Sequence, residues 1–224
     1  MKKPPLWATI FTVFGIIVLC SLGTWQLKRL SWKNDIIAQL DQAYANPVTN
    51  PDLSELEEND KIVASISGEL LFQKTLRLGH IVQDQKPGQY IISFLKTDHG
   101  ILPINLGFIA TNMELKDHPL QTLKNLEVSG LIKTPEWNSF TPENKPEENI
   151  WYRLDTEQIA DNQNLKNLLP LVMRVEKINA SIDAKDLSLH KRWQPNNNHA
   201  QYAFFWFTLA TALAAIFTLR FIRQ

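Results

Sequence analysis

Residues 200–219, AQYAFFWFTLATALAAIFTL, form an uncharged and predominantly apolar run near the carboxyl end of the chain. The run contains no charged side chain, and about 20 apolar residues make a helix that can cross the ~30 Å hydrocarbon core of a membrane. Arg220 follows the run directly, as basic residues often follow a membrane span. The sequence therefore predicts a transmembrane helix over residues 199–219, with a short tail at 220–224.

A second apolar run lies near the amino end. Residues 4–27 carry no charge, and residues 6–22 are almost wholly apolar. Lys2 and Lys3 before the run also resemble the start of a secretory signal, but no small-x-small cleavage site follows the apolar core. We expect a retained transmembrane helix over 6–27 after a tail at 1–5, with a cleaved signal as the alternative. Two spans put both termini on one side, and the flanking Lys and Arg residues do not decide which side.

The residues between the runs, 28–198, predict one β-rich extramembrane domain. Residues 30–44 have the apolar spacing of a short amphipathic helix, and Asp155 is a suitable N-cap for a second short helix. Alternating or β-branched segments predict about six strands, at 62–67, 75–79, 89–95, 101–109, 126–132 and 171–178. The expected fold is an α+β membrane protein in which two transmembrane helices flank an antiparallel sheet or small barrel with short helices.

Composition and motifs exclude several classes of function. The chain has 23 Lys and Arg residues and 23 Asp and Glu residues, which are scattered rather than clustered, so a nucleic-acid partner is not expected. Cys20 is the only cysteine, which excludes an internal disulfide and a thiolate metal site. The chain has no phosphate loop, nucleotide-binding fingerprint, nucleophile elbow or histidine pair at metal spacing. These absences argue against an enzyme.

His199 is the candidate metal ligand, because it stands at the entrance of the second apolar run. A neutral imidazole in such a place can bind a metal or haem iron through one nitrogen. On a helix, Tyr202, Ala203 and Trp206 share the face of His199. The aromatic rings of Tyr202 and Trp206 suit a flat macrocycle. Aromatic residues near a membrane boundary also form an ordinary interfacial belt, so the residues alone leave both interpretations open. The other four histidines are interpreted as solvated or locally bonded: His80, His99, His118 and His190.

The end of the first apolar run carries a second cluster on the same side of the membrane. Trp25 and Gln26 could touch a planar ligand held between the spans, and Lys28 and Arg29 could pair with its carboxylates. Ordinary membrane anchoring explains this cluster equally well. Small residues would let the two spans approach closely, namely Gly15, Ala210 and Ala214.

The order of these motifs resembles the surfeit locus protein 1 family over nearly the whole chain. The strongest marks are Gly23-x-Trp25-Gln26-x-x-Arg29-x-x-x-Lys33 and Asn197-Asn198-His199-x-x-Tyr202-Ala203-x-x-Trp206-Phe207. Two positions depart from the family pattern. The strand at residues 105–110 lacks the family's arginine and tryptophan, and His80 replaces a basic residue.

The resemblance implies an assembly factor of haem-copper cytochrome c oxidase. It implies transient binding of haem a near the outer membrane interface, with the iron on His199 and support from Trp25, Gln26, Arg29, Tyr202 and Trp206. The implied partners are cytochrome c oxidase subunit I, the lipid bilayer and, as a further candidate, haem a synthase. The implied location is the cell inner membrane with cytoplasmic termini and a periplasmic domain, or the mitochondrial inner membrane with the domain in the intermembrane space. The alternative is a scaffold that stabilises the oxidase subunit through the β domain without binding haem.

Overall fold

The computed structural model describes residues 4–56, 61–113, 115, 119–179 and 187–221. The chain divides into two compact units, Met1–Asp41 with Gln194–Gln224, and Gln42–Trp193. Lys2, Lys3 and His118 lie outside the described residues. The elements in chain order are α1 Leu6–Ala45, β1 Val48–Thr49, η1 Leu53–Glu55, β2 Ile62–Leu70, η2 Phe72–Lys74, β3 Leu76–Gln83, β4 Lys86–Thr97, β5 Gly100–Ala110, η3 Pro119–Thr122, β6 Asn125–Lys133, η4 Pro146–Glu148, α2 Thr156–Gln163, β7 Val172–Ile178 and α3 His199–Phe221.

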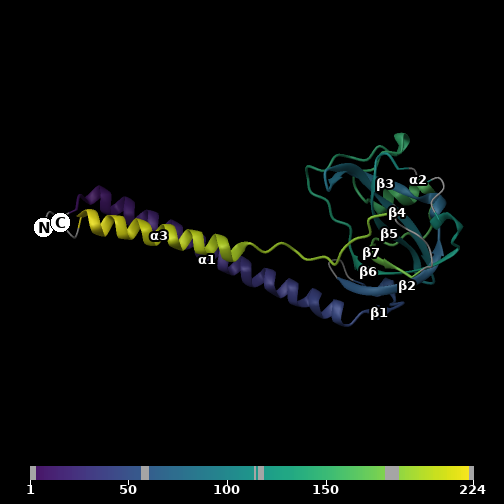
Figure 1. The fold of residues 1–224 in the computed structure, drawn as a ribbon, viewed down its shortest axis with the longest axis horizontal. Coiled ribbons are helices and arrows are strands. Elements are labelled where there is room, and N and C mark those ends of the chain that lie inside the picture. The colour runs from purple at the N-terminus through teal and green to yellow at the C-terminus, as the bar shows by residue number, and fades with distance from the viewer. Residues whose placement is uncertain (1–3, 57–60, 114, 116–118, 180–186, 222–224) are drawn as a thin grey trace. The chain divides into compact units, whose positions relative to one another are not determined.

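In the first unit, α1 and α3 lie side by side and run antiparallel (Figure 1). Small residues bring the two helices together, as the sequence suggests. A Cβ atom on Gly23 would lie 2.7 Å from the ring of Phe207, and one on Gly15 would lie 3.0 Å from Leu213. The absence of a side chain at these glycines therefore allows the helices to pack closely.

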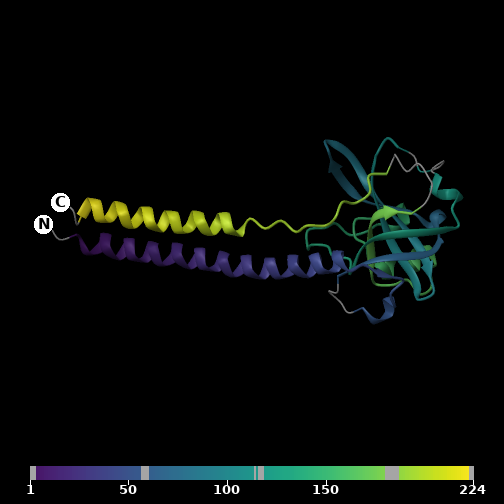
Figure 2. The ribbon, with the colours of Figure 1, turned by 60° about the horizontal axis from the view of Figure 1, so that its bottom comes forward.

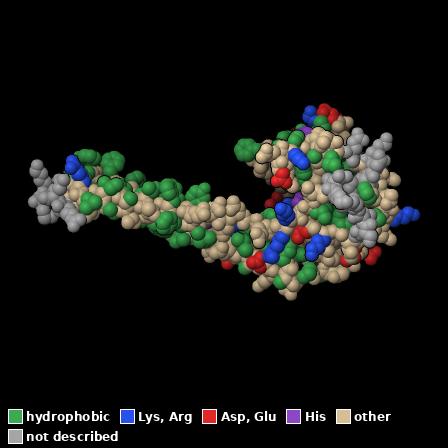
Figure 3. All heavy atoms as spheres, in the orientation of Figure 1, with side chains coloured by type: hydrophobic (Ala, Val, Ile, Leu, Met, Phe, Trp, Pro, Cys, Tyr) green, Lys and Arg blue, Asp and Glu red, His purple; other side chains and the backbone are tan. Residues whose placement is uncertain are grey.

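Both helices are long and apolar enough to cross a membrane. Most of their large apolar side chains point outward, and the exposed fraction reaches 71% at Phe11 and 75% at Phe204. Figure 3 shows hydrophobic side chains along the outer surface of the helix pair in that view. Water would disfavour so much exposed apolar surface, whereas lipid accepts it. Two apolar helices thus flank the β-rich domain, as predicted.

The helix expected at residues 30–44 is not a separate element, because α1 continues without a break to Ala45. Residues 28–45 contain neither glycine nor proline, so nothing in the backbone interrupts the helix where the apolar run ends. Asn46-Pro47 then stops the helix, since the residue before a proline disfavours helical backbone angles.

The second unit is a closed β-barrel (Figure 2). The strand order is β1-β2-β6-β7-β5-β4-β3, and β2 also pairs with β4 at Glu69–Lys96 and Leu70–Leu95. This pairing closes a ring of β2, β6, β7, β5 and β4. The small barrel is confirmed. The described residues contain seven strands rather than about six, because the two residues of β1 are too few to show an alternating pattern.

Two apolar clusters hold the barrel. One fills the interior, with Ile104, Leu106 and Val175 among its most buried members. The other lies beneath α2 and is centred on Trp151 and Phe94. The helix α2 begins as expected, because the carboxylate of Asp155 accepts hydrogen bonds from the first backbone N–H groups of the helix. This confirms the predicted N-cap.

Candidate functional site

The candidate ligand site centres on a contact between His199 and Gln26. His199 is the first residue of α3, and its Nδ1 atom lies 2.7 Å from Oε1 of Gln26 on α1. Gln26 is only 8% exposed, so its amide oxygen needs a hydrogen-bond partner, and the imidazole supplies one. The packing of the helix pair thus fixes the histidine ring at the place where α3 begins.

This hydrogen bond determines which imidazole nitrogen is available to a metal. The amide oxygen of Gln26 can only accept, so the bond requires a proton on Nδ1 of His199. The lone pair of the neutral ring is then on Nε2. Histidine ligands in metalloproteins have the same arrangement, in which one nitrogen donates to a polar group and the other binds the metal. The residues present therefore fit a single neutral nitrogen ligand.

Trp25 lies on a different face of α1 from Gln26. Successive residues of a helix are about 100° apart, so the burial of Gln26 against α3 turns Trp25 away. Trp25 is 56% exposed. It lines a groove of about 480 Å³ with Ile17, Cys20, Ser21, Thr24 and Lys28, which contains neither Gln26 nor His199. The structure thus brings Gln26 to His199 and places Trp25 at a neighbouring surface.

The remaining predicted residues lie on α1 and α3, outside the hydrogen bond between His199 and Gln26. The guanidinium of Arg29 lies 3.9 Å from the ring centre of Trp32, which is a cation–π contact within α1. Tyr202 is exposed, whereas Trp206 is half-buried and packs edge-on against Phe205. Both aromatic residues are therefore accessible from outside the helix pair, and their role in binding a ligand stays a prediction.

Close packing limits where a ligand can lie. The ring of Phe207 fills the space beside Gly23, and Ala203 and Ala210 are buried in the same contact face. A planar macrocycle cannot fit between the two helices there. The expectation of a ligand held between the spans at His199 stays a prediction.

Two contacts of this site were missed from the sequence. The side-chain amide of Asn197 donates to the side-chain oxygen of Asn34 at 2.9 Å, one more link between the ends of the helix pair. The ring of Phe207 packs on Gly23, as described above. The available signal was that Asn197, Gly23 and Phe207 all belong to the quoted motifs.

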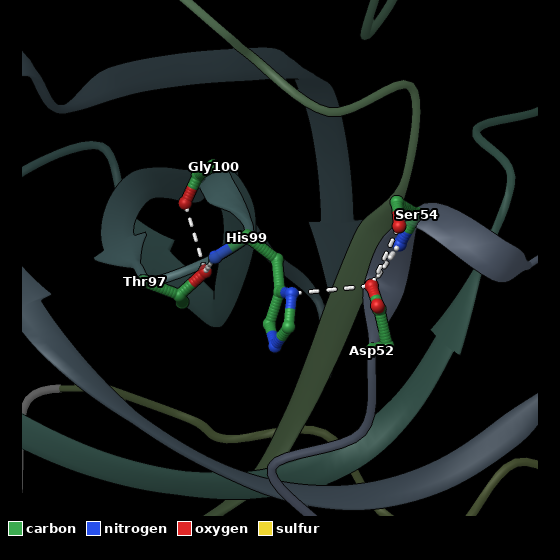
Figure 4. A network of polar contacts seen from close by, with 5 residues as sticks. All are labelled: Asp52, Ser54, Thr97, His99 and Gly100. Atoms are coloured by element: carbon green, nitrogen blue, oxygen red, sulfur yellow. Dashed lines mark hydrogen bonds and ion pairs between the residues drawn. The ribbon is translucent and has the colours of Figure 1, made fainter.

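The histidines of the β domain have other surroundings. Nδ1 of His99 lies 3.1 Å from Oδ1 of Asp52, which also accepts hydrogen bonds from Ser54 (Figure 4). These Ser54 bonds hold the pKa of Asp52 below its usual value. His80 packs edge-on against Tyr152. His99 is thus locally bonded, as interpreted, and no group of three or more potential metal ligands occurs among the described residues.

His190 differs from this interpretation, because it is neither solvated nor fully bonded. Its Nε2 atom is buried and has no hydrogen-bond partner among the described residues. Burial and, to a smaller extent, the nearby Arg174 lower the pKa of His190 to about 4. The ring is therefore neutral at pH 7.

These features define a class of protein, a β-barrel domain joined to a pair of apolar helices that can span a membrane and that hold a histidine against a buried glutamine. The model of the SURF1 family matches residues 13–211. The chain therefore belongs to the SURF1 family, whose members are known as cytochrome c oxidase assembly factors.

Relatives occur in bacteria and in eukaryotes. A SURF1-like protein of Rickettsia prowazekii is 30% identical over 222 residues, which cover 94% of this chain and 87% of the relative. Surfeit locus protein 1 of Rattus norvegicus is 26% identical, over 97% of this chain and 76% of the relative. A SURF1-like protein of Dictyostelium discoideum is 25% identical, over 100% of this chain and 99% of the relative. The similarity thus includes both apolar helices and the barrel.

Proposed function

We propose that this protein is a non-catalytic assembly factor that binds haem a through His199 and assists its insertion into subunit I of cytochrome c oxidase. The observation that carries the proposal is the hydrogen bond between Nδ1 of His199 and Oε1 of Gln26. It presents Nε2 as a nitrogen ligand at the mouth of an apolar helix pair. Membership of the SURF1 family supports the same role.

The arrangement suits a carrier that must release what it binds. The bound group supplies an iron that accepts a nitrogen ligand and an apolar ring with carboxylates at its edge. This chain contributes one histidine from the exposed side of the helix pair, with Tyr202 and Trp206 nearby on α3. A single axial ligand on an open surface allows exchange to a partner more readily than a closed site with two ligands does.

The membrane location follows from the same proposal. The two apolar helices cross the bilayer and the barrel lies on the opposite side from the termini, in the periplasm or, for an organellar protein, in the intermembrane space. His199 then lies near the membrane surface on the barrel side. Subunit I is the recipient, and haem a synthase is the corresponding donor.

The optical spectrum of the full-length protein tests this proposal. Protein purified in detergent from cells that make haem a should carry haem a absorbance, whereas protein from cells without haem a synthesis should be colourless. Reduction and oxidation should shift the bands, as they do for a ligated haem. A colourless protein from haem a-producing cells would contradict the proposal.

Gln26→Leu should weaken haem a binding by about tenfold without removing the ligand, because groups that hydrogen-bond to a metal-binding histidine typically contribute about 10–100-fold in affinity. Leucine has nearly the volume of glutamine but cannot hold the Nδ1 proton of His199 in place. Titration of the colourless protein with haem a measures the change. Gln201→Leu is the matched control, since Gln201 is exposed on the first turn of α3. Equal affinities for the two variants would show that Gln26 does not orient His199.

A scaffold that binds no haem is the second candidate, and one surface of the barrel favours it. Phe140 is 93% exposed and Trp137 is 45% exposed in the loop before η4. Trp137 lines one groove of about 460 Å³ with Tyr152. Phe140 lines another groove of about 460 Å³ with Tyr152 and His80. Exposed aromatic side chains are typical of protein–protein contacts. This function requires normal oxidase assembly in a variant that carries no haem.

A further inference from the structure

Two buried nitrogen atoms in the β domain lack hydrogen-bond partners. They are Nε of Arg174 and Nε2 of His190, and neither has a partner among the described residues. Buried polar atoms in folded proteins are nearly always paired, with protein, water or a bound ion. The two unpaired atoms point to a partner that the chain itself does not provide.

The fold places these two side chains on one surface. On β7, Met173 and Val175 point into the barrel interior, so Arg174 between them points to the opposite face. The backbone N–H of His190 donates to the carbonyl of Val175 at 3.0 Å, which sets His190 beside Arg174. The ring of His190 also packs at 5.2 Å from the ring of Tyr90 on β4.

The neighbouring polar groups do not neutralise Arg174. Asn105, its partner on β5, accepts from the backbone N–H of Gly107. Glu176 accepts a hydrogen bond from the hydroxyl of Tyr44 at 2.5 Å. Burial, together with this bond, raises the pKa of Tyr44 to about 12, so the phenol keeps its proton. No ion pair between Arg174 and a carboxylate is present in the described part of the chain.

Other cations reinforce the positive charge of this surface. The guanidinium of Arg192 lies 4.4 Å from the ring centre of Tyr44. The ammonium of Lys133 lies 5.9 Å from the ring centre of Trp193, although it also pairs with Glu136 at 3.4 Å. Among the described residues, three cations thus lie in this region, Arg174, Arg192 and Lys133, together with the carboxylates Glu176 and Glu136. An anion is the partner with complementary charge.

We propose that Arg174 and His190 form a binding site for a phosphate group. Arginine presents two parallel N–H donors to a phosphate, and the neutral imidazole can present a third at Nε2. Phosphate accepts from several directions at once, which suits a guanidinium and an imidazole on different segments. This site is independent of the haem proposal, because it uses no residue of α3.

Two sources could supply the phosphate, a lipid headgroup or free phosphate in solution. The segment of residues 191–198 joins His190 to the first residue of α3. Eight residues span at most about 30 Å even when fully extended. The chain length alone therefore allows a lipid headgroup as the source.

The test uses the full-length protein in an uncharged detergent. Inorganic phosphate, added in one series, should bind saturably in calorimetric titration, and Arg174→Leu should weaken the binding at least about tenfold. Arg174→Lys keeps the charge but loses the paired donors, so it should also weaken binding. Lys96→Leu is the matched control, because it removes one exposed cation elsewhere on the barrel and should change nothing.

A second measurement does not depend on a substitution. Bound phosphate would favour the charged imidazole, so the pKa of His190 seen by NMR should rise from about 4 when phosphate is added. Micelles containing phosphatidylglycerol form the lipid series. Competition by the lipid against phosphate identifies a headgroup site, and binding of phosphate without competition identifies a free-anion site. No Arg174-dependent binding in either series would mean that water alone satisfies the two nitrogens, and would overturn the proposal.

Discussion

His199→Ala protein made in cells that synthesise haem a is expected to retain about one tenth or less of the wild-type pigment, because it loses the axial nitrogen. The substitution removes the imidazole while leaving the apolar contact between α1 and α3, which rests on Gly23, Phe207 and Ala203. The variant should therefore insert and fold normally. Haem absorbance per mole of purified protein measures the result.

The matched control for this experiment is His99→Ala. It also removes one histidine, but from a contact with the carboxylate of Asp52 in the β domain. Its pigment content should equal that of the wild type. Full pigment in His199→Ala would remove His199 from the proposed mechanism.

The same variant separates the two candidate functions. A haem carrier without its ligand should lower the yield of active oxidase in a strain that lacks the native protein. A scaffold, which binds no haem, should keep that yield in the same variant. The spectrum and the oxidase yield of one variant thus give different results for the two functions.

The helices could be predicted from the sequence because their signal is local. Twenty uncharged apolar residues suffice to identify each span, whatever the rest of the chain does. The end of α1 was harder to predict as a single helix, since the change from apolar to polar residues near Lys28 suggests a boundary that the backbone does not have. Helical hydrogen bonds depend on the absence of breakers, and the first proline after Lys28 is Pro47.

Closure of the barrel could not be derived from the strand pattern. Alternation predicts which residues face the core, but the ring closes through Glu69–Lys96 and Leu70–Leu95, a pairing between strands that β3 separates in the sequence. Antiparallel sheet and barrel have the same local pattern. Only the long-range pairing distinguishes them.

The candidate site was predictable in its residue types but not in its contacts. Gln26 and His199 both belonged to recognised motifs, yet their hydrogen bond depends on the register of two helices far apart in sequence. The separation of Trp25 from Gln26 follows from the side of α1 that packs on α3. Arg174 and His190 gave no signal, because they are brought together by the backbone hydrogen bond from His190 to Val175, which joins segments that the strand pattern does not connect.

Gly107→Ala is expected to destabilise the barrel by about 2–4 kcal/mol, more than an ordinary surface substitution does. Gly107 has a φ angle of +104°, which disfavours any residue with a side chain. A Cβ atom there would also lie 2.1 Å from the backbone oxygen of Ser188. Thermal unfolding of the full-length protein should shift downward by roughly 5–15 °C.

Gly79→Ala separates the two causes of this loss. Gly79 also has a positive φ angle, +73°, but the nearest atom to its Cβ position is a side-chain carbon of Ile81 at 3.6 Å. This variant should therefore lose only about 1 kcal/mol from backbone strain. Equal losses of stability in the two variants would show that the contact between residue 107 and the backbone of Ser188 adds nothing.

The close approach of β5 at Gly107 to the backbone of Ser188 matters because it holds the segment that carries His190. Phe108 and Ser188 exchange two backbone hydrogen bonds, of 3.0 and 2.9 Å, directly beside Gly107. An added methyl group would push Ser188 away and break both bonds, and His190 follows two residues later. Gly107→Ala should therefore also weaken phosphate binding, whereas Gly79→Ala should leave phosphate binding unchanged. Stability and anion binding should thus fall together only when the contact between residue 107 and Ser188 is disturbed.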